Sequence, residues 1–469
     1  MRLRMLQVVF VLAVASLMLS SSTWGQSGVK QTGTLRDGAK YVIEVPQPWN
    51  GTLFLYSHGY DRPDKPNPPA MDAGDPLTGA FMLSRGFALA GSSYANTGWA
   101  VQEALVDQIA VLDIFVQTVG KPQRTIAWGH SLGGMITAGL IQRNPDRFDA
   151  ALPMCGVLSG GVATWNTALD SAFAFQTLLG SSQLQVVNIT GPVGNLTLAE
   201  GLLAAAQGTP QGRARLALVS ALADGPGWFD PTSPEPAPTD FAGQEMNQFL
   251  WDRQVDFPFV FAFRAELEFR AGGNPSSNVG VDYRRQFAHS VDAAEVRALY
   301  EQAGLDLEAD LDELNETVRI SADPRAMKYL EQNIIFDGDI HIPVLTLHTT
   351  GDGLVVVENE SAYRQVVQED GNQALLRRTF VSRAGHCTFT PAETIAAVLV
   401  LIDRLDTGKW RNLDPAALNA AAAALGPLNT FGGGSVIPSA FVDFHPAQYL
   451  RPFDGETEEC ESGSPCGDR

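Results

Sequence analysis

The residue best suited to covalent chemistry is Ser131, which stands in the run GHSLG at residues 129–133. This spacing matches G-x-S-x-G. A β-branched and aromatic run at 125–128 precedes it, and an apolar helix-like run at 134–140 follows it. A serine on such a strand-to-helix turn is forced outward at the carboxyl end of a sheet. We therefore expect Ser131 to be the nucleophile of an acyl transfer; the alternative is an ordinary turn without chemistry.

A serine nucleophile needs a base, and the base needs an acid that orients it. In α/β folds that carry a nucleophilic serine on such a turn, the catalytic residues follow along the chain in the order serine, then Asp or Glu, then His. Asp352 follows the apolar run 343–348, and His386 follows the next strand-like run, 375–381. Because the carboxyl ends of parallel strands meet at one edge of a sheet, both side chains are expected beside Ser131. We predict a triad in which His386 is the base and Asp352 is the acid.

Other acidic and imidazole side chains are less well placed for these roles. Glu358 stays open as an alternative acid. Asp337 and Asp339 precede the strand-like run 343–348 and so belong to the opposite edge of the sheet. His348 lies inside that run, and we expect it to be a core or rim residue.

Acyl transfer also needs donors for the negative oxygen of the tetrahedral intermediate. The run SHGY at 57–60 follows a strand-like run at 52–56, where this architecture places a loop that supplies one backbone N–H. The residue after the nucleophile supplies the second. We therefore expect the oxyanion hole to be formed by the backbone N–H groups of Tyr60 and Leu132.

Strand-like and helix-like runs alternate on both sides of a long helical stretch, which predicts an α/β protein with a mainly parallel sheet. The expected strands are 40–45, 52–57, 86–93, 125–128, 148–154, 341–348 and 375–381. The expected helices between them are 100–119, 133–142, 361–368 and 394–405. We divide the chain into a core of residues 26–156 and 338–406, a helical cap or lid insertion of residues 157–337, and a C-terminal extension of residues 407–469.

Residues 40–157 and 338–406, with GHSLGG at 129–134, resemble the α/β-hydrolase superfamily, on the side of its secreted esterases and lipases. The resemblance implies the α/β-hydrolase fold and an acyl-enzyme mechanism, with Ser131 as nucleophile, His386 as base and then acid, and Asp352 orienting the imidazole. The insertion resembles the cap of that superfamily. The adjacent His386 and Cys387 are similar to tannase and feruloyl-esterase relatives, although the partner cysteine of those proteins would stand at the position of His130.

The composition excludes several other classes of protein. The chain has 469 residues, 45% of them hydrophobic and 18% charged, which is enough apolar material for a sizeable core. Its 52 acidic and 32 basic residues give a net charge of −20, which disfavours nucleic acid and anionic lipid as partners. We expect no cofactor and no metal ion. The expected partner is a small-molecule or oligomeric ester substrate, and the oligomeric state is left open.

The first 25 residues are typical of a secretory signal peptide. Arg2 and Arg4 begin the segment, an apolar run at 6–19 follows, and small residues fill 20–25. The apolar run is shorter than the roughly 20 residues of a membrane-spanning helix, so we expect no stable membrane insertion. An N-terminal membrane anchor is the alternative. The protein is therefore expected to be secreted, to the periplasm or the extracellular medium.

Export makes the four cysteines candidates for disulfide bonds. Cys460 and Cys466 are close in a polar tail and suggest a local loop, which leaves Cys155 and Cys387 as the second pair. The other pairings and two free thiols remain open.

The insertion is rich in aromatic residues, among them Phe257, Phe259, Phe261 and Phe263. These side chains either line a substrate pocket or form the core of the cap itself. We predict a secreted serine hydrolase of carboxylic esters. The alternatives are a secreted serine peptidase of the aminopeptidase kind and a non-catalytic binding protein on the same scaffold.

Overall fold

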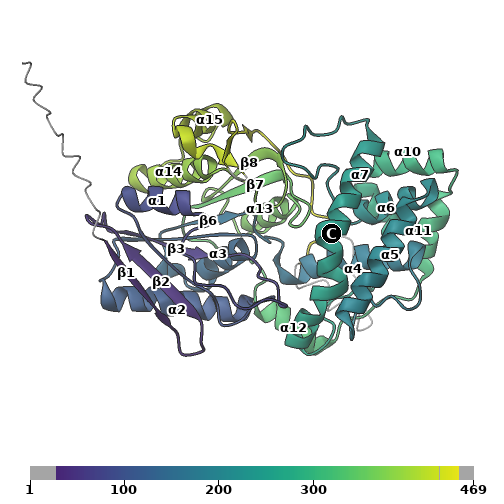
Figure 1. Ribbon diagram of the computed structural model, residues 1–469, viewed down its shortest axis with the longest axis horizontal. Coiled ribbons are helices and arrows are strands. Elements are labelled where there is room, and N and C mark those ends of the chain that lie inside the picture. The colour runs from purple at the N-terminus through teal and green to yellow at the C-terminus, as the bar shows by residue number, and fades with distance from the viewer. Residues whose placement is uncertain (1–27, 432–433, 454–469) are drawn as a thin grey trace, which may run out of the picture.

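The computed structural model describes residues 28–431 and 434–453, which form two lobes side by side (Figure 1). One lobe is a twisted sheet with helices on both faces, and the other is built from helices. The α/β-hydrolase fold with a mainly parallel sheet, expected from the sequence, is confirmed. The expected signal peptide and the Cys460–Cys466 loop lie outside the described residues.

The main sheet has the strand order β1-β2-β4-β3-β5-β6-β7-β8-β11. The bounds of its strands are β1 Val29–Thr34, β2 Lys40–Val45, β3 Thr52–Ser57, β4 Ala88–Ser92, β5 Arg124–His130, β6 Ala150–Met154, β7 Val344–Gly351, β8 Leu376–Ala384 and β11 Phe441–Val442. Strands β4, β3, β5, β6, β7 and β8 run parallel, and the pairs β1–β2, β2–β4 and β8–β11 are antiparallel. The carboxyl ends of β3, β5, β7 and β8 therefore lie along one edge of the sheet.

Helices cover both faces of this sheet, so the central strands are buried along almost their whole length. The helices of this lobe are α1 Pro76–Ser84, α2 Val101–Thr118, α3 Leu132–Arg143, η1 Pro145–Arg147, α13 Asn359–Glu369, α14 Pro391–Thr407, α15 Pro415–Ala423 and η4 Gly426–Leu428. One apolar cluster joins the sheet to α2, α3 and α13, and another joins its opposite face to α1, α14 and α15. The edge that carries the strand ends is thus held rigidly from two sides.

The helical lobe, or cap, is the segment between β6 and β7. Its elements are α4 Gly160–Leu179, α5 Pro192–Gln207, α6 Pro210–Ala221, α7 Phe241–Trp251, the π-helical turns η2 Asp252–Asp256 and η3 Phe259–Phe263, α8 Arg264–Ala271, α9 Tyr283–His289, α10 Ala293–Ala303, α11 Leu307–Glu316 and α12 Pro324–Gln332. Most of these helices share an apolar cluster of their own, whereas Leu267 of α8 and Leu330 of α12 belong to the cluster of the sheet lobe. The start of α12 shows why they form where they do: Asp323 accepts a hydrogen bond from the N–H of Arg325, and Pro324 occupies the first turn.

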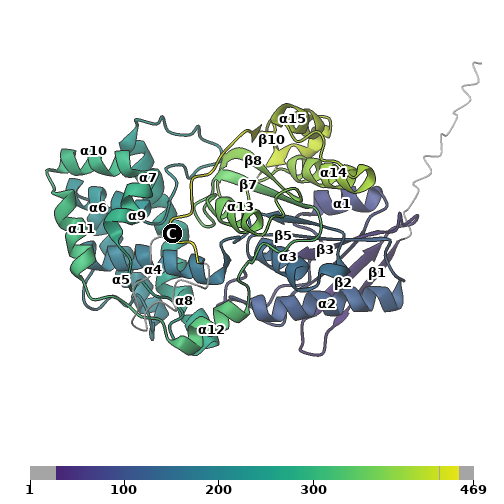
Figure 2. The ribbon, with the colours of Figure 1, turned by 180° about the vertical axis from the view of Figure 1, so that it is seen from behind.

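The C-terminal segment joins the two lobes, which the sequence did not lead us to expect. It adds β11 to the main sheet beside β8 and forms a small ribbon of β9 Thr430–Phe431 and β10 Ser435–Val436. It then runs towards the cap, as the yellow trace in Figure 2 shows. Arg451 forms an ion pair of 2.8 Å with the buried Asp170 of α4, and Tyr449 lies 3.0 Å from the hydroxyl of Thr167.

In the described part of the chain, no helix has the length and the hydropathy needed to cross a bilayer.

Candidate active site

Ser131 lies on the sharp turn between β5 and α3. Its backbone has φ 60° and ψ −127°, a conformation that is strained for a residue with a side chain. The flanking glycines make this turn possible, because a Cβ at Gly133 would overlap the carbonyl oxygen of Ser57 on β3, and a Cβ at Gly129 would overlap the same atom. The N–H of Ser131 donates to the carbonyl of Met154 on β6 over 2.9 Å. The hydroxyl is thus presented at the carboxyl edge of the sheet.

The expected acid and base lie side by side at this edge. Asp352 directly follows β7, and His386 lies two residues beyond the end of β8. The Nδ1 of His386 is 2.8 Å from Oδ2 and 3.0 Å from Oδ1 of Asp352. The Asp352 carboxylate also accepts hydrogen bonds from the N–H groups of Leu354 and Val355, at 3.1 and 3.0 Å. The imidazole is therefore held at Nδ1, which leaves Nε2 available for a proton transfer.

A second histidine stands behind the acid. His348, buried within β7, has its Nε2 2.8 Å from the carbonyl of Val355 and 3.6 Å from Oδ2 of Asp352. Its Nδ1 is 3.2 Å from the carboxylate of Glu360, which also accepts a hydrogen bond from Thr346. Because both ring nitrogens face acceptors, the arrangement suits an imidazolium that donates from both.

These neighbours shift the pKa values of the buried groups in opposite directions. Burial alone would lower the pKa of His348, but its contacts with Asp352 and Glu360 raise it to about 10. Burial alone would raise the pKa of Asp352, but His386 and His348 lower it to about 2. Asp352 is therefore an ionised carboxylate over the whole neutral range, as the orienting acid of a triad must be.

Ser131 and His386 open on the same cavity, but no hydrogen bond joins their side chains. This outer cavity of about 410 Å³ is lined by both residues together with Gly59, Tyr60 and Cys387. A second, inner cavity of about 140 Å³ extends from Ser131 into the cap. Catalytic hydrogen bonds are often long in unliganded enzymes and tighten when a substrate binds.

The two expected oxyanion donors lie beside the serine. Tyr60 and Leu132 line the inner cavity together with Ser131. The N–H of Leu132 belongs to the first turn of α3, where the helix offers no acceptor. The N–H of Tyr60 donates to no acceptor among the described residues. Both groups are therefore available to a substrate oxygen.

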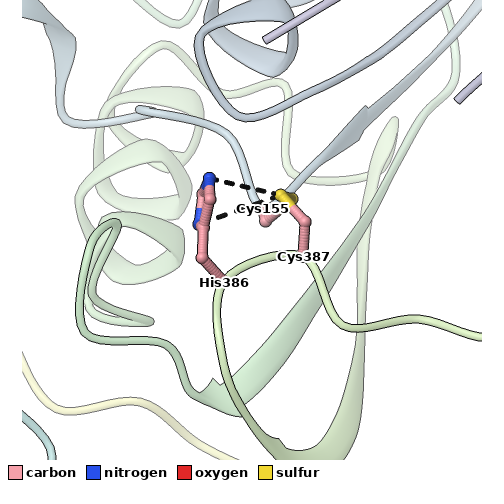
Figure 3. A group of neighbouring side chains, drawn as sticks. All are labelled: Cys155, His386 and Cys387. Atoms are coloured by element: carbon pink, nitrogen blue, oxygen red, sulfur yellow. Dashed lines mark hydrogen bonds between the residues drawn. A yellow bond between two sulfur atoms is a disulfide. The ribbon is translucent and has the colours of Figure 1, made fainter. Parts of the chain in front are cut away.

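A disulfide closes the site next to the base (Figure 3). Cys155, at the end of β6, is bonded to Cys387, which follows His386, with 5.5 Å between their Cα atoms. The pairing favoured from the sequence is the one that the structure has. The Sγ of Cys387 lies 3.4 Å from Nε2 of His386. Although these three residues lie close enough to hold a metal ion, both sulfur atoms are used in the disulfide.

The aromatic residues of the cap divide between the two roles that the sequence left open. Phe257 and Phe261 belong to the apolar cluster inside the cap. Phe259 and Phe263 line the outer cavity, and Phe259 packs against the ring of Tyr60 at 4.9 Å between centroids. The inner cavity adds further aromatic walls, formed by Trp99, Trp165, Trp251 and Tyr449.

The alternative acid lies away from the base. Glu358 is buried, and no hydrogen bond joins it to His386. Reasoning from the sequence missed the partners of His348, because the strand pattern gives no sign of the carboxylate of Glu360 on α13. It also missed two acidic residues of the cap, Asp252 and Asp256, which line the inner cavity. Their four-residue spacing was the only signal that could have pointed to them.

A mainly parallel sheet with a serine on the turn after β5, and an aspartate and a histidine after β7 and β8, defines the α/β-hydrolase fold of serine hydrolases. Residues 82–176 match the prolyl oligopeptidase family (Peptidase_S9). The chain is 30% identical over 431 residues to the o-phthalyl amidase of Xanthobacter agilis, with 84% of this chain and 91% of the relative covered. The chain belongs to the family of that amidase, and it is a serine hydrolase of this fold.

Two solved structures are more distantly similar to this chain. The rice cell wall degrading esterase LipA from Xanthomonas oryzae shares 13% identity, with 82% of this chain and 90% of that chain covered and a TM-score of 0.33. An esterase from Aspergillus oryzae shares 14% identity, with 82% and 80% covered and a TM-score of 0.41.

Proposed function

We propose that the protein hydrolyses carboxylic esters through an acyl-enzyme intermediate, with Ser131 as nucleophile, His386 as general base and then acid, and Asp352 as the orienting acid. The observation that carries the proposal is the His386–Asp352 pair, 2.8 Å apart, which opens on the same cavity as the strained Ser131. All three residues come from the carboxyl edge of one sheet.

Each step follows from this placement. With Nδ1 held by Asp352, Nε2 of His386 accepts the proton of the Ser131 hydroxyl as its oxygen attacks the carbonyl carbon. The N–H groups of Tyr60 and Leu132 then stabilise the negative oxygen of the tetrahedral intermediate. His386 returns the proton to the leaving group, the acyl-enzyme forms, and water repeats the sequence to release the acid.

The aromatic walls of both cavities favour binding of an ester with an apolar acyl or alcohol group. Amide hydrolysis is a second candidate, favoured by the relative of Xanthobacter agilis, which is an amidase. The triad and the oxyanion hole serve both reactions. A peptidase of the aminopeptidase kind is one form of this second candidate.

Parallel assays of the purified protein on matched substrates separate these candidates. The panel contains p-nitrophenyl esters of increasing chain length, the corresponding p-nitroanilides, an o-phthalyl amide and aminoacyl p-nitroanilides. The proposal expects the highest kcat/KM on an ester. If any anilide or the o-phthalyl amide is turned over faster than every ester, amide hydrolysis and not ester hydrolysis is the main reaction. A Glu313→Gln variant, changed on the exposed face of α11, is the matched control and is expected to keep the same order of substrates.

We also propose that residues 1–25 direct export and are removed. The disulfide between Cys155 and Cys387 supports an oxidising compartment. N-terminal sequencing of the protein recovered from the culture medium or the periplasm is expected to begin near residue 26. Recovery of the intact N-terminus in the cytoplasm would contradict export.

A further inference from the structure

Two carboxylates of the cap line the inner cavity that begins at Ser131. Asp252 and Asp256 are the first and last residues of the π-helical turn η2. Such turns are rare within helices and are frequently found at functional sites. The turn places both residues on the wall of the cavity that Ser131 also lines. These carboxylates are part of the active site without being part of the triad.

Neither carboxylate is paired with a positively charged side chain. No ion pair in the described part of the chain includes Asp252 or Asp256, and none of the described residues that line the inner cavity is Lys, Arg or His. Asp252 is 95% buried, since 5% of its surface is exposed, and its Oδ2 has no hydrogen-bond partner. A further acidic group lies nearby, because Glu245 is within electrostatic reach of Asp252.

An unpaired carboxylate in such a place is costly, because burial disfavours its charged form. Burial, with the charge of Asp352 nearby, raises the pKa of Asp256 to about 8. Burial and the neighbouring Asp256 also raise the pKa of Asp252. A cationic ligand in the cavity would relieve this cost and return both groups to their ionised form.

The geometry favours an ammonium group over a metal ion. Divalent cations need several ligand atoms that converge on one point. In the described residues, the only group of three potential ligands within 4.8 Å of one another is Cys155, His386 and Cys387, where both sulfurs are used in the disulfide. Asp252 and Asp256 therefore lack a third ligand, whereas two carboxylates suffice for the N–H donors of an ammonium ion.

We propose that Asp252 and Asp256 bind the protonated amino group of the substrate, so that the substrates are amino-bearing esters or amides whose scissile carbonyl lies at Ser131. The inference rests on the proposed function for the reaction, but not for the binding. The aromatic rings of Trp165, Trp251 and Phe259 line the same cavity and suit the apolar body of such a substrate. An acyl group derived from an aromatic amino acid combines both features.

Binding can be measured apart from catalysis in the Ser131→Ala protein. Isothermal calorimetry compares phenylalanine amide, which carries an ammonium group, with 3-phenyllactamide, which carries a hydroxyl at the same position. We expect the ammonium ligand to bind about tenfold more tightly, the usual gain of a charge-assisted hydrogen bond at a shielded site. Equal binding of the two ligands, or tighter binding of 3-phenyllactamide, would overturn the inference.

The aspartates are tested in the same background with Asp252→Asn and Asp256→Asn. Each substitution keeps the shape of the side chain and removes its charge, so each is expected to bring the two affinities close to each other. Glu313→Gln, which removes one exposed carboxylate from cap helix α11, is the matched control and is expected to keep the tenfold preference. A preference that survives both Asn substitutions would contradict the assignment to these residues.

A kinetic comparison separates this inference from the proposed function. With Ser131 intact, kcat/KM is measured on the methyl esters of phenylalanine and of 3-phenyllactic acid. We expect the amino ester to be favoured about tenfold, and the preference to be lost in Asp252→Asn and Asp256→Asn. A protein that prefers the ammonium ligand in calorimetry but hydrolyses neither ester would refute the proposed function and leave the binding site supported. Hydrolysis of both esters at equal rates would refute the binding site alone.

Discussion

The carboxylates on the sheet side and on the cap side of the active site have opposite environments. On the sheet side, Asp352 faces His386 and His348, accepts two backbone hydrogen bonds, and has a pKa of about 2. On the cap side, Asp252 and Asp256 face no cation, and the pKa of Asp256 is about 8. Asp352 and Asp252 are both buried and Asp256 is partly buried, so burial alone does not explain the difference.

From this contrast we infer that the two lobes have different tasks. The core supplies every partner that its acid needs, so its charges are fixed before a substrate arrives. The cap leaves its carboxylates unpaired, so their charge depends on what enters the cavity. A pre-organised reaction centre and a ligand-dependent binding site can therefore lie in one active site.

The largest effect is expected for the acid of the core. Asp352→Asn is expected to lower kcat by about 10⁴-fold, because the imidazole of His386 loses both the group that fixes its tautomer and the partner of its charged form. The matched control is Glu358→Gln, the alternative acid, which is expected to keep its activity. Steady-state kinetics on the best ester measure both variants. Near-normal activity of Asp352→Asn, together with loss in Glu358→Gln, would show that the acid is misassigned.

The second-largest effect is expected from the disulfide, which stabilises the folded state of the core. It joins the end of β6 to the loop of His386 across 232 residues of chain, so its loss frees a very long loop in the unfolded state. The double variant Cys155→Ser/Cys387→Ser is expected to lower the free energy of unfolding by about 3 kcal/mol, measured by urea denaturation. An unfolding free energy equal to that of the parent would exclude a structural role for this bond.

His348 is expected to stabilise the fold in a pH-dependent manner. Its pKa is raised from an ordinary 6.5 to about 10, so the folded state binds its proton more tightly than the unfolded state does. The stabilisation is therefore fully present below pH 6.5 and is lost as the pH rises through 10. His348→Gln is expected to cost about 2 kcal/mol at pH 6 and much less at pH 10, measured by urea denaturation at both values. A cost that does not change with pH would mean that His348 is neutral.

On the cap side, substitution of Asp256 is expected to stabilise the ligand-free protein. The pKa of Asp256 is raised from 3.8 to about 8, so its ionisation destabilises the folded state as the pH rises between these values. Asp256→Asn is expected to equal the parent near pH 4 and to be more stable by about 1 kcal/mol at pH 8. Thermal unfolding followed by circular dichroism measures the difference. A variant that is less stable than the parent at pH 8 would show that Asp256 has a partner in the fold.

Much of the fold was predictable, because the sheet is built from local patterns. The runs 40–45 and 52–57 coincide with β2 and β3, and the helix expected at 100–119 corresponds to α2. The two edge strands β1 and β11 were not expected. Both pair at the rim of the sheet: β1 is largely exposed and β11 has only two residues, so each carries a weak strand signal. The pairing of β11 also depends on a long return of the chain that no local pattern reveals.

The candidate site was predictable where chain order and strand ends determine it. Ser131, Asp352 and His386 each follow a strand, so their common edge could be inferred without coordinates. The partners of His348 and the carboxylates Asp252 and Asp256 could not, because they depend on how helices pack against the sheet. The cap lies between β6 and β7 and folds over the strand ends, and sequence patterns do not give the direction that it takes.

Covalent labelling tests directly whether Ser131 is an activated nucleophile. The folded protein is treated with a fluorophosphonate, digested, and mapped by mass spectrometry. We predict a single adduct on the peptide that contains Ser131, its absence in Ser131→Ala, and its retention in Ser84→Ala, which changes an exposed serine of α1. An adduct on another residue, or a folded protein that takes up no label, would contradict the account.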